Sequence, residues 1–275
     1  MAKARSGRQL PPMHLQDAVA LVTGAGHRIG RAIALGLAEA GCHVVVHYGR
    51  SREPANETAD AVRERGREAF TFAADLARPE EIEALFCAIE DRFGRLDVLV
   101  NSAATFLRVP LEETTVEQWD AVSAVNARAP FLCTQHAACL MREVESRAGA
   151  ALDLAPGSIV NIGDMAGVTA WKGYAAHGAS KAGVLHLTRL TARELAPDIR
   201  VNAIVPGPIL PPAGEEMSEE AWEKKGTRVP LSRPGDPSHI ADTVVFLSTN
   251  DYMTGDVLFV DGGEHLLAGG GRDDA

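Results

Sequence analysis

Four side chains between residues 164 and 181 have the chemistry to move protons. Tyr174, His177 and Lys181 are spaced three and four residues apart, so they share one face of a helix. Asp164 directly follows an apolar run that is typical of a strand. An unperturbed imidazole titrates at about pH 6.5 and can donate a proton near neutrality. A nearby lysine disfavours the charged imidazole, whereas a nearby carboxylate favours it. These residues predict a cleft that protonates a bound molecule.

A glycine-rich turn supplies a second chemistry. The segment Thr23-Gly24-Ala25-Gly26-His27-Arg28-Ile29-Gly30 follows an apolar run and leads into a helical pattern. Glycine lets a backbone approach a ligand closely, and the free N–H groups and dipole of a helix N-terminus attract an anion. The sequence therefore predicts a nucleotide-phosphate site here, in preference to a merely structural turn.

The end of the second apolar run indicates which nucleotide is bound. Dinucleotide-binding proteins that prefer NAD place a carboxylate there for the ribose hydroxyls, but this sequence has His47-Tyr48-Gly49-Arg50-Ser51. Arg50 and Ser51, with Arg28 from the glycine turn, favour the dianionic 2′-phosphate of NADP. The alternative is that these arginines are solvated surface residues. Asp75 either accepts a hydrogen bond from the adenine amino group or caps a helix.

Short apolar runs alternate with longer amphipathic stretches along nearly the whole chain. This alternation predicts an α/β fold, a Rossmann-type doubly wound parallel sheet of about seven strands with helices on both faces. The runs interpreted as buried strands are 18–22, 43–48, 96–101, 158–163, 200–205 and 257–262, with one more strand before Asp75. The helical patterns include residues 28–41, 53–68, 79–94 and 178–195.

Length and composition favour a single domain. The 275 residues, 46% of them apolar, allow one or two domains, and no linker or repeat divides them. We expect one domain over residues 16–265, a loose leader over 1–15 and a disordered tail over 266–275. Residues 145–157 are interpreted as an extension between a helix and a strand, and the Pro-rich stretch 206–236 as a substrate loop.

Charge and hydropathy exclude several classes of partner. A net charge of −10 argues against a nucleic-acid-binding protein. No apolar run approaches the ~18 residues of a membrane span, and the basic start lacks the apolar core of a signal peptide, so we expect a cytoplasmic protein. The cysteines share no metal or redox spacing, so we interpret all four as small buried hydrophobic residues and expect no metal site: Cys42, Cys87, Cys133 and Cys139.

Roughly residues 15–265 resemble the short-chain dehydrogenase/reductase family. The matching pieces, in chain order, are Thr23–Gly30, Asp75, Asn101-Ser102-Ala103, Asn126, Lys181 and Pro206-Gly207. The resemblance implies hydride transfer from NADPH to a small molecule, with Asn126 and Lys181 in the catalytic group. It also implies a homotetramer built through helices at 115–145 and 172–196. The residues expected to bind the cofactor, from the motifs and the resemblance together, are Gly24, Arg28, Ile29, Gly30, His47, Tyr48, Arg50, Ser51, Asp75, Leu76, Asn101, Ser102, Ala103, Lys181, Pro206, Gly207 and Ile209.

Within that family the chain most resembles NADPH-dependent pteridine reductases and dihydromonapterin or dihydrofolate reductases. Arg28 stands where the turn usually has its second glycine. The resemblance implies that Phe106 stacks on a planar pterin, that Arg28 reaches both cofactor phosphate and substrate, and that Tyr174 and Trp222 flank the same ring. A core phenylalanine and a helix-capping arginine are the plainer interpretations. The alternative function is a 3-oxoacyl or general carbonyl reductase, which needs room for a flexible chain beside Phe106 and Trp222.

The family's catalytic Tyr-x-x-x-Lys pair departs from its usual form here. His177 occupies the tyrosine position and Asp164 the serine position, the latter as in pteridine reductases. Three hypotheses stay open. His177 replaces tyrosine as the proton donor, or Asp164 and Tyr174 handle the proton while His177 binds substrate or water. The third is a catalytically impaired, NADP-binding pseudoenzyme with a sensing or scaffolding role.

Overall fold

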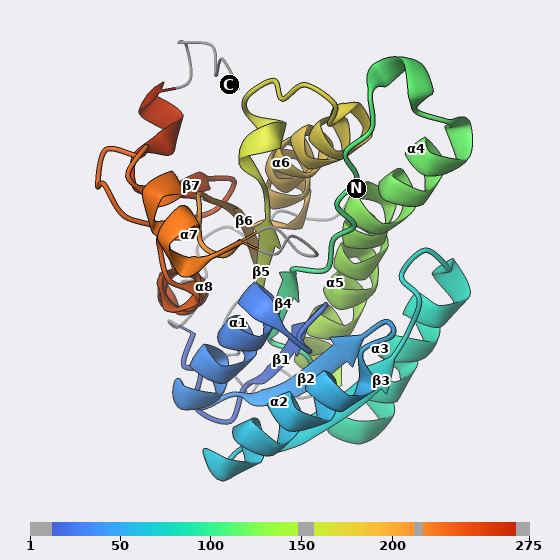
Figure 1. Ribbon diagram of the computed structural model, residues 1–275. Helices are drawn as coiled ribbons and strands as arrows, with labels where there is room; N and C mark the ends of the chain where they lie inside the picture. Colours follow the sequence, from blue (N-terminus) through green and yellow to red (C-terminus); the bar gives the residue numbers. More distant parts are fainter. Residues whose placement is uncertain (1–12, 148–156, 212–216, 268–275) are drawn as a thin grey trace.

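A computed structural model describes residues 13–147, 157–211 and 217–267. Seven strands form one parallel sheet in the order β3-β2-β1-β4-β5-β6-β7 (Figure 1), which confirms the predicted fold. The strands are β1 Val19–Val22, β2 His43–Tyr48, β3 Ala69–Ala73, β4 Val98–Asn101, β5 Gly157–Ile162, β6 Ile199–Pro206 and β7 Val257–Val260.

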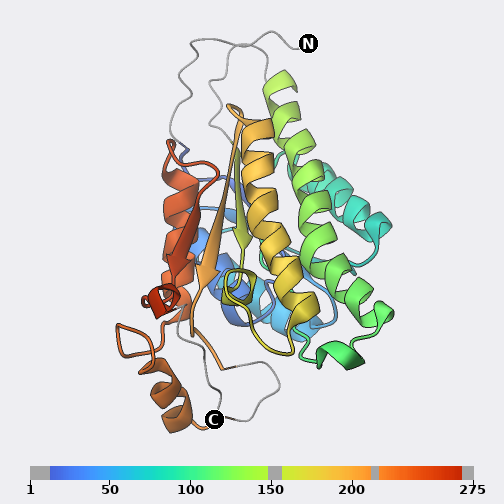
Figure 2. The same cartoon turned by 90° about the horizontal axis from the view of Figure 1, so that it is seen from above.

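Helices cover both faces of this sheet (Figure 2). The α-helices are α1 Arg28–Glu39, α2 Arg52–Glu64, α3 Pro79–Phe93, α4 Val116–Ser123, α5 Ala129–Arg147, α6 Ala175–Leu195, α7 Glu219–Gly226 and α8 Pro237–Thr249. One apolar core lies between the sheet and α1, α2 and α8, and a second lies under α3, α5 and α6. Strands β1 and β4 are buried along their whole length because the two helical layers shield both of their faces.

The strand order determines where a ligand-binding site lies in this fold. From β1 the chain winds one way through β2 and β3, and it then returns to β4 and winds the other way. The loops after β1 and β4 therefore part at the carboxyl edge of the sheet, where such folds bind their ligands. The glycine turn follows β1, and Asp164 and Gly207 follow β5 and β6 at the same edge.

The long helix predicted at 115–145 is interrupted. Between α4 and α5 lies one π-helical turn, η2, over Ala124–Arg128, and it contains Asn126. A π turn inserts a residue into the helical repeat, and such turns are frequent at functional sites. The predicted tetramer contact through these helices stays a prediction.

The helix predicted over 172–196 begins later than expected. Tyr174 is the N-cap of α6, with φ −118° and ψ 30°, and the preceding Gly173 has φ +83°. This left-handed turn delivers the chain into the helix only at Ala175. Tyr174 therefore caps the helix instead of lying within it, but its ring still lies 6.4 Å from that of His177, so these two side chains converge as predicted.

The prediction that every cysteine is buried is wrong for two of the four. Cys87 and Cys139 are exposed, because they lie on the outer faces of α3 and α5, whereas Cys42 and Cys133 are buried. Mainly through burial, the pKa of each buried thiol is raised to about 12. Neither buried thiol therefore ionises to a reactive thiolate near neutral pH.

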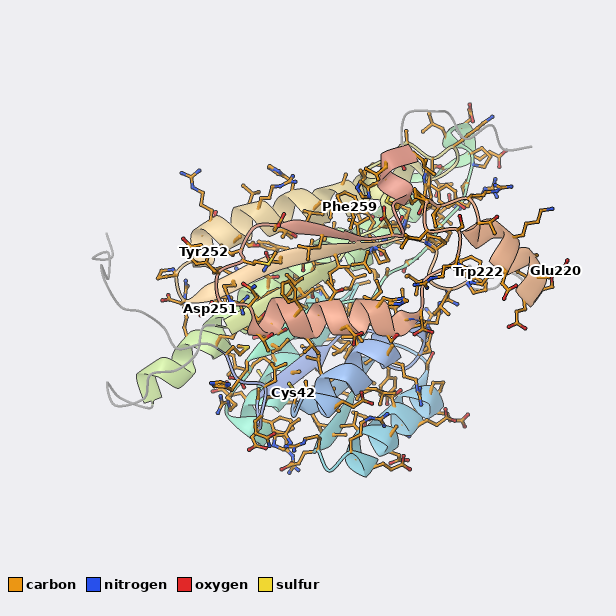
Figure 3. All side chains as sticks on the ribbon, turned by 90° about the vertical axis from the view of Figure 1, so that its left-hand side faces the viewer. Cys42, Glu220, Trp222, Asp251, Tyr252 and Phe259 are labelled. Carbon is orange, nitrogen blue, oxygen red and sulfur yellow. The ribbon has the colours of Figure 1, made fainter. Side chains whose placement is uncertain are left out.

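Parts of the predicted ends lie outside the described residues. These parts are residues 1–12 of the leader, 148–156 of the extension, 212–216 of the substrate loop and 268–275 of the tail. Met13 and Leu15, at the end of the predicted leader, pack into the core. The substrate loop carries α7, which Figure 3 shows with Trp222 at the opposite end of the molecule from Tyr252.

Candidate active site

The glycine turn after β1 is tightly packed against its neighbours. Gly24 has φ +69°, and a Cβ atom there would lie 3.0 Å from the Cα of Ala103. A Cβ on Gly30 would lie 2.2 Å from the carbonyl oxygen of Gly24. Both positions therefore exclude any larger residue, and α1 starts close beneath the turn.

Arg28 begins α1 in a left-handed conformation, with φ +56°. This conformation is uncommon for a residue with a side chain and costs of order 1 kcal/mol, and it fits the interpretation that Arg28 stands at a glycine position. Its exposed guanidinium donates to the carbonyl of Pro211, in the loop after β6. Arg28 thus links the glycine turn to the loop after β6, while Ile29 packs partly into the core.

Hydrogen bonds join the glycine turn to the loop after β4. The Thr23 hydroxyl accepts hydrogen bonds from the N–H groups of Ser102, at 2.9 Å, and Ala103, at 3.1 Å. Asn101 donates to Asn161 at 2.8 Å, so the ends of β4 and β5 are also joined. The predicted segment Asn101-Ser102-Ala103 therefore lines the crevice from beside the glycine turn.

The residues predicted to select the nucleotide are exposed or half-buried. Arg50 is exposed, and Ser51 is half-buried as the N-cap of α2. Asp75 is exposed and accepts from the N–H of Ala77 at 3.0 Å, within the turn that precedes α3. The N-cap of α3 is Arg78, so the interpretation of Asp75 as a helix cap is wrong. Its proposed contact with adenine stays a prediction.

Several predicted cofactor residues support the site from behind. The side chains of Tyr48, Leu76 and Ile209 are buried among apolar neighbours. His47 is buried as well, and both of its ring nitrogens are engaged within the protein. Pro206 ends β6 and Gly207 follows it. A Cβ on Gly207 would lie 2.5 Å from the Cα of Asp261, so the backbones touch there.

His177 and Asp164 form the centre of the candidate site. The Nε2 atom of His177 lies 3.4 Å from Oδ2 of Asp164. Among the residues that the structure describes, this buried Nε2 has no hydrogen-bond partner. The other ring nitrogen, Nδ1, lies 3.3 Å from the carbonyl oxygen of Thr105 and 3.4 Å from Nδ2 of Asn126. The ring is thus held from one side and faces a carboxylate on the other.

Asp164 is held as an anion. Its Oδ1 accepts from the N–H of Ala166 at 2.7 Å, which caps the short 3-10 helix η4 (Met165–Gly167). Burial raises the pKa of the Asp164 carboxyl. The contact with His177, the bond from Ala166 and the charge of Lys181 outweigh burial and leave the pKa below its ordinary value. The carboxylate therefore stays charged at neutral pH.

Lys181 lies one turn beyond His177, as predicted. It is buried, and its ammonium donates to the carbonyl of Ile162 at 2.8 Å. Burial lowers the pKa of Lys181, and the negative charge of Asp164 opposes that shift. Asp164 thus has a histidine and a lysine as its two basic neighbours.

The π turn presents Asn126 to the loop that carries Phe106. Oδ1 of Asn126 accepts from the N–H of Thr105 at 2.7 Å, and its Nδ2 donates to the Thr105 carbonyl at 2.8 Å. Nδ2 also lies 3.2 Å from Oγ of Ser180. The sequence pointed to Asn126 but not to Thr105 or Ser180, because pairings across 21 and 54 residues leave no local pattern.

Phe106, Tyr174 and Trp171 form an aromatic wall beside His177. The Phe106 ring centroid lies 5.1 Å from that of Tyr174 and 4.7 Å from that of His177. Trp171 packs edge-on against Tyr174 at 5.5 Å. Phe106 is 47% exposed, so the interpretation as a core phenylalanine is wrong: its loop is tied down at both ends instead, at Thr105 and by the bond from Val109 to Gly173.

Trp222, predicted to join this aromatic surface, lies on α7 in the substrate loop. The Nζ atom of Lys225 lies over the Trp222 ring, 5.8 Å from its centroid. Figures 1 and 2 place α7 on the same side of the molecule as α8 and away from α4. Contact between Trp222 and a bound substrate stays a prediction.

Comparison with known proteins identifies the family. The family described as enoyl-(acyl carrier protein) reductase matches residues 24–265. The 3-oxoacyl-[acyl-carrier-protein] reductase FabG of Staphylococcus aureus is 37% identical over 250 residues, which cover 90% of this chain and 98% of that protein. A mutant of a Serratia marcescens short-chain dehydrogenase/reductase superposes with a TM-score of 0.80 at 30% identity, over 91% of this chain and 99% of that one. The chain belongs to the short-chain dehydrogenase/reductase family.

A further relative of the family was solved with ligands in place. The landomycin C-6 ketoreductase LanV, with bound NADP and rabelomycin, superposes with a TM-score of 0.78 at 31% identity, over 92% of this chain and 98% of that one. Its nucleotide is the one that the sequence predicts for this chain. In the described part of the chain, no cluster of three or more His, Cys, Asp or Glu side chains could hold a metal ion, and no helix is long and apolar enough to cross a membrane.

Proposed function

We propose that this short-chain reductase uses NADPH to reduce a ketone lying against Phe106, and that His177 donates the proton. The observation that carries the proposal is the pairing of the buried His177 Nε2 with the Asp164 carboxylate at 3.4 Å, in the position of the family's catalytic tyrosine. The names of FabG and LanV support a carbonyl substrate, and they favour the 3-oxoacyl or general carbonyl reductase over the pteridine reductase.

The residues present fit NADPH. Gly24 has no side chain, and a Cβ there would meet Ala103. The turn therefore keeps a bare backbone that a phosphate can approach. Exposed Arg28 and Arg50 supply cations for the phosphates. When bound, NADPH supplies the hydride.

The chain's own residues manage the proton. The carboxylate of Asp164 faces Nε2 of His177, and Asn126 and Thr105 hold the ring from its Nδ1 side. His177 then gives the proton on Nε2 to the oxygen that develops negative charge during reduction. The side chain of Asp164 is 27% exposed, whereas that of His177 is 2% exposed. Asp164 therefore connects the imidazole to solvent, and through it the lost proton is replaced.

A pterin is the second candidate substrate. The observation that favours it is the half-exposed ring of Phe106, which presents a flat apolar surface between Tyr174 and the cleft. A fused-ring ketone would use the same surface, whereas a linear 3-oxoacyl chain would use little of it.

The test is NADPH oxidation with three substrates: a 3-oxoacyl thioester, a fused-ring ketone and dihydrobiopterin. The native protein is compared with His177→Ala and His177→Tyr, and with His186→Ala as the matched control on the exposed face of the same helix. We expect His177→Ala to lose roughly 10²–10⁴-fold in kcat with unchanged NADPH affinity, and His186→Ala to keep the native rate.

Each other outcome points to another hypothesis. Unchanged turnover in His177→Ala assigns the proton to Asp164 and Tyr174. A native protein that turns over no carbonyl or pterin, together with activity gained in His177→Tyr, supports the pseudoenzyme. Turnover of dihydrobiopterin alone supports the pteridine reductase.

A further inference from the structure

The side chain of His47 occupies a buried position directly behind the glycine turn. Its Nδ1 lies 3.0 Å from the backbone nitrogen of Gly24, and its Nε2 lies 3.0 Å from the carbonyl oxygen of Ala74. His47 is 2% exposed. Resemblance alone placed this residue among the cofactor ligands, but both of its polar atoms are directed into the protein.

These two contacts fix the state of the ring. A backbone N–H can only donate, so Nδ1 of His47 must be an unprotonated acceptor toward Gly24. A carbonyl oxygen can only accept, so Nε2 must carry the hydrogen and donate to Ala74. The imidazole is therefore neutral, with its proton on Nε2. Burial agrees with this assignment, since it lowers the pKa of His47 to about 4, against the bond to Ala74, which raises it.

The partners of His47 belong to both halves of the nucleotide site. Gly24 opens the phosphate turn, and Ala74 directly precedes Asp75. The backbone adds to the same connection, because the N–H of Ala25 donates to the carbonyl of His47 at 2.9 Å and that of Ala74 donates to Tyr48 at 3.1 Å. His47 thus ties the exit of β1 to the exit of β3 across the end of β2.

We propose that His47 is a positioning residue that holds the phosphate turn in its binding conformation without touching the cofactor. The inference rests on the proposed binding of NADPH. Gly24 has φ +69°, a conformation that a glycine leaves easily, so a side-chain acceptor for its N–H keeps the turn ordered before the nucleotide arrives. A turn already ordered binds more tightly than one ordered by its ligand. Because the turn faces the pyrophosphate, which NADPH and NADH share, both nucleotides should depend on His47 equally.

Two isosteric variants separate the two contacts. In His47→Asn the side-chain oxygen takes the place of Nδ1 and can accept from Gly24. In His47→Gln the amide nitrogen reaches toward the place of Nε2 and can donate to Ala74, but Gly24 loses its acceptor. Dissociation constants for NADPH and NADH are measured by nicotinamide fluorescence without substrate, with Arg50→Ala as the comparison that removes a cation expected to read the 2′-phosphate.

We expect His47→Asn to stay within about threefold of the native affinity for both nucleotides, and His47→Gln to bind both about tenfold more weakly. Arg50→Ala should weaken NADPH alone. The proposal is overturned if His47→Gln keeps native affinities for both nucleotides. It is also overturned if this variant binds NADPH more weakly but NADH normally, because His47 would then act on the 2′-phosphate. A native protein that binds neither nucleotide overturns the proposed function itself, and this inference with it.

A measurement on the native protein covers the case in which His47→Gln does not fold. Nitrogen-15 NMR of the histidine rings distinguishes the two tautomers, and the resonances of His47 are assigned by their loss in His47→Asn. We expect a neutral ring with its proton on Nε2, unchanged when NADPH is added. A proton on Nδ1, a charged ring, or a change of tautomer on binding would contradict a positioning role.

Discussion

Nε2 of His177 faces Oδ2 of Asp164 at 3.4 Å, and Asp164 is the more exposed of the two. At this distance the two side chains attract each other as charges but do not form a good hydrogen bond. The carboxylate is an anion at neutral pH, since its pKa lies below the ordinary value. Its effect on His177 is therefore chiefly electrostatic, and it acts on the protonated ring.

Asp164→Asn should remove that effect with little change of shape. We expect kcat for ketone reduction to fall about tenfold or more, since a charge interaction near a protein surface is worth one to a few kcal/mol. Steady-state rates from pH 5 to 9 measure this loss.

The rate of the native protein at acid pH gives the control for Asp164→Asn. Because the pKa of Asp164 is already low, its protonation should not limit the native rate above about pH 4. A native rate in Asp164→Asn across this range would show that the carboxylate does not act on the proton donor.

The order of strands and helices followed from the sequence because apolar runs and amphipathic periods are local signals. β3 is the exception. Its segment Ala69–Ala73 is only partly buried, since it forms one edge of the sheet, and so it has no continuous apolar run. It was expected only from the position of Asp75.

The candidate site was predicted in its residue types but not in its contacts. Lys181 and Asp164 stand where the motif places them. The pairing of Asn126 with Thr105 depends on a π turn, and the inward direction of His47 depends on the exits of β1 and β3. Neither of these arises within a window of neighbouring residues, so no periodicity could indicate them.

Gly30→Ala should damage the nucleotide site directly. The Cβ of alanine would lie 2.2 Å from the carbonyl oxygen of Gly24 and 3.2 Å from the Cα of Ala25, and both of these are backbone atoms that cannot rotate away. We expect a loss of about 1–3 kcal/mol in the free energy of unfolding and at least a tenfold loss of NADPH affinity. Urea unfolding and fluorescence titration measure the two.

Gly183→Ala is the matched control for Gly30→Ala. Gly183 also lies within a helix, but a Cβ there would meet no described atom within 4 Å. Since alanine is a better helix former than glycine, this variant should gain about 0.5–1 kcal/mol. Equal destabilisation by the two substitutions would mean that the collision with Gly24 is relieved elsewhere.

Arg50→Ala tests the choice between the two nucleotides. The exposed guanidinium of Arg50 follows β2, where a carboxylate would select NADH. A charge-assisted hydrogen bond is worth about 1.5–3 kcal/mol, and exposure places this one at the lower end. We therefore expect roughly a tenfold loss of NADPH affinity with NADH unaffected. Arg52→Ala, which removes an equally exposed charge two residues away, should leave both affinities unchanged. An unaltered ratio in Arg50→Ala would refute the assignment.

The neutral His47 predicts how stability depends on pH. The pKa of this ring is lowered to about 4 in the folded chain, whereas an unfolded histidine titrates at about 6.5. Between these values the unfolded state binds a proton that the native state does not. Acidification therefore favours unfolding, by at most about 1.4 kcal/mol per pH unit. The stabilising effect of the neutral ring is full above about pH 6.5 and is lost as the pH falls toward about 4, below which the native ring is protonated too.

Urea unfolding at several pH values from 7 down to 4.5 measures this dependence. The asparagine in His47→Asn cannot titrate. As the pH falls, the free energy of unfolding of this variant should therefore decrease less steeply than that of the native protein, by up to about 1.4 kcal/mol per pH unit. His186→Ala removes an exposed histidine on α6 and should keep the native slope. Because His47 joins the exits of β1 and β3, the nucleotide turn should open first as the pH falls. NADPH affinity should then weaken in the same interval in which the slopes of native protein and His47→Asn diverge. Parallel slopes for those two proteins would mean that the buried imidazole is charged or that its proton is exchanged without cost.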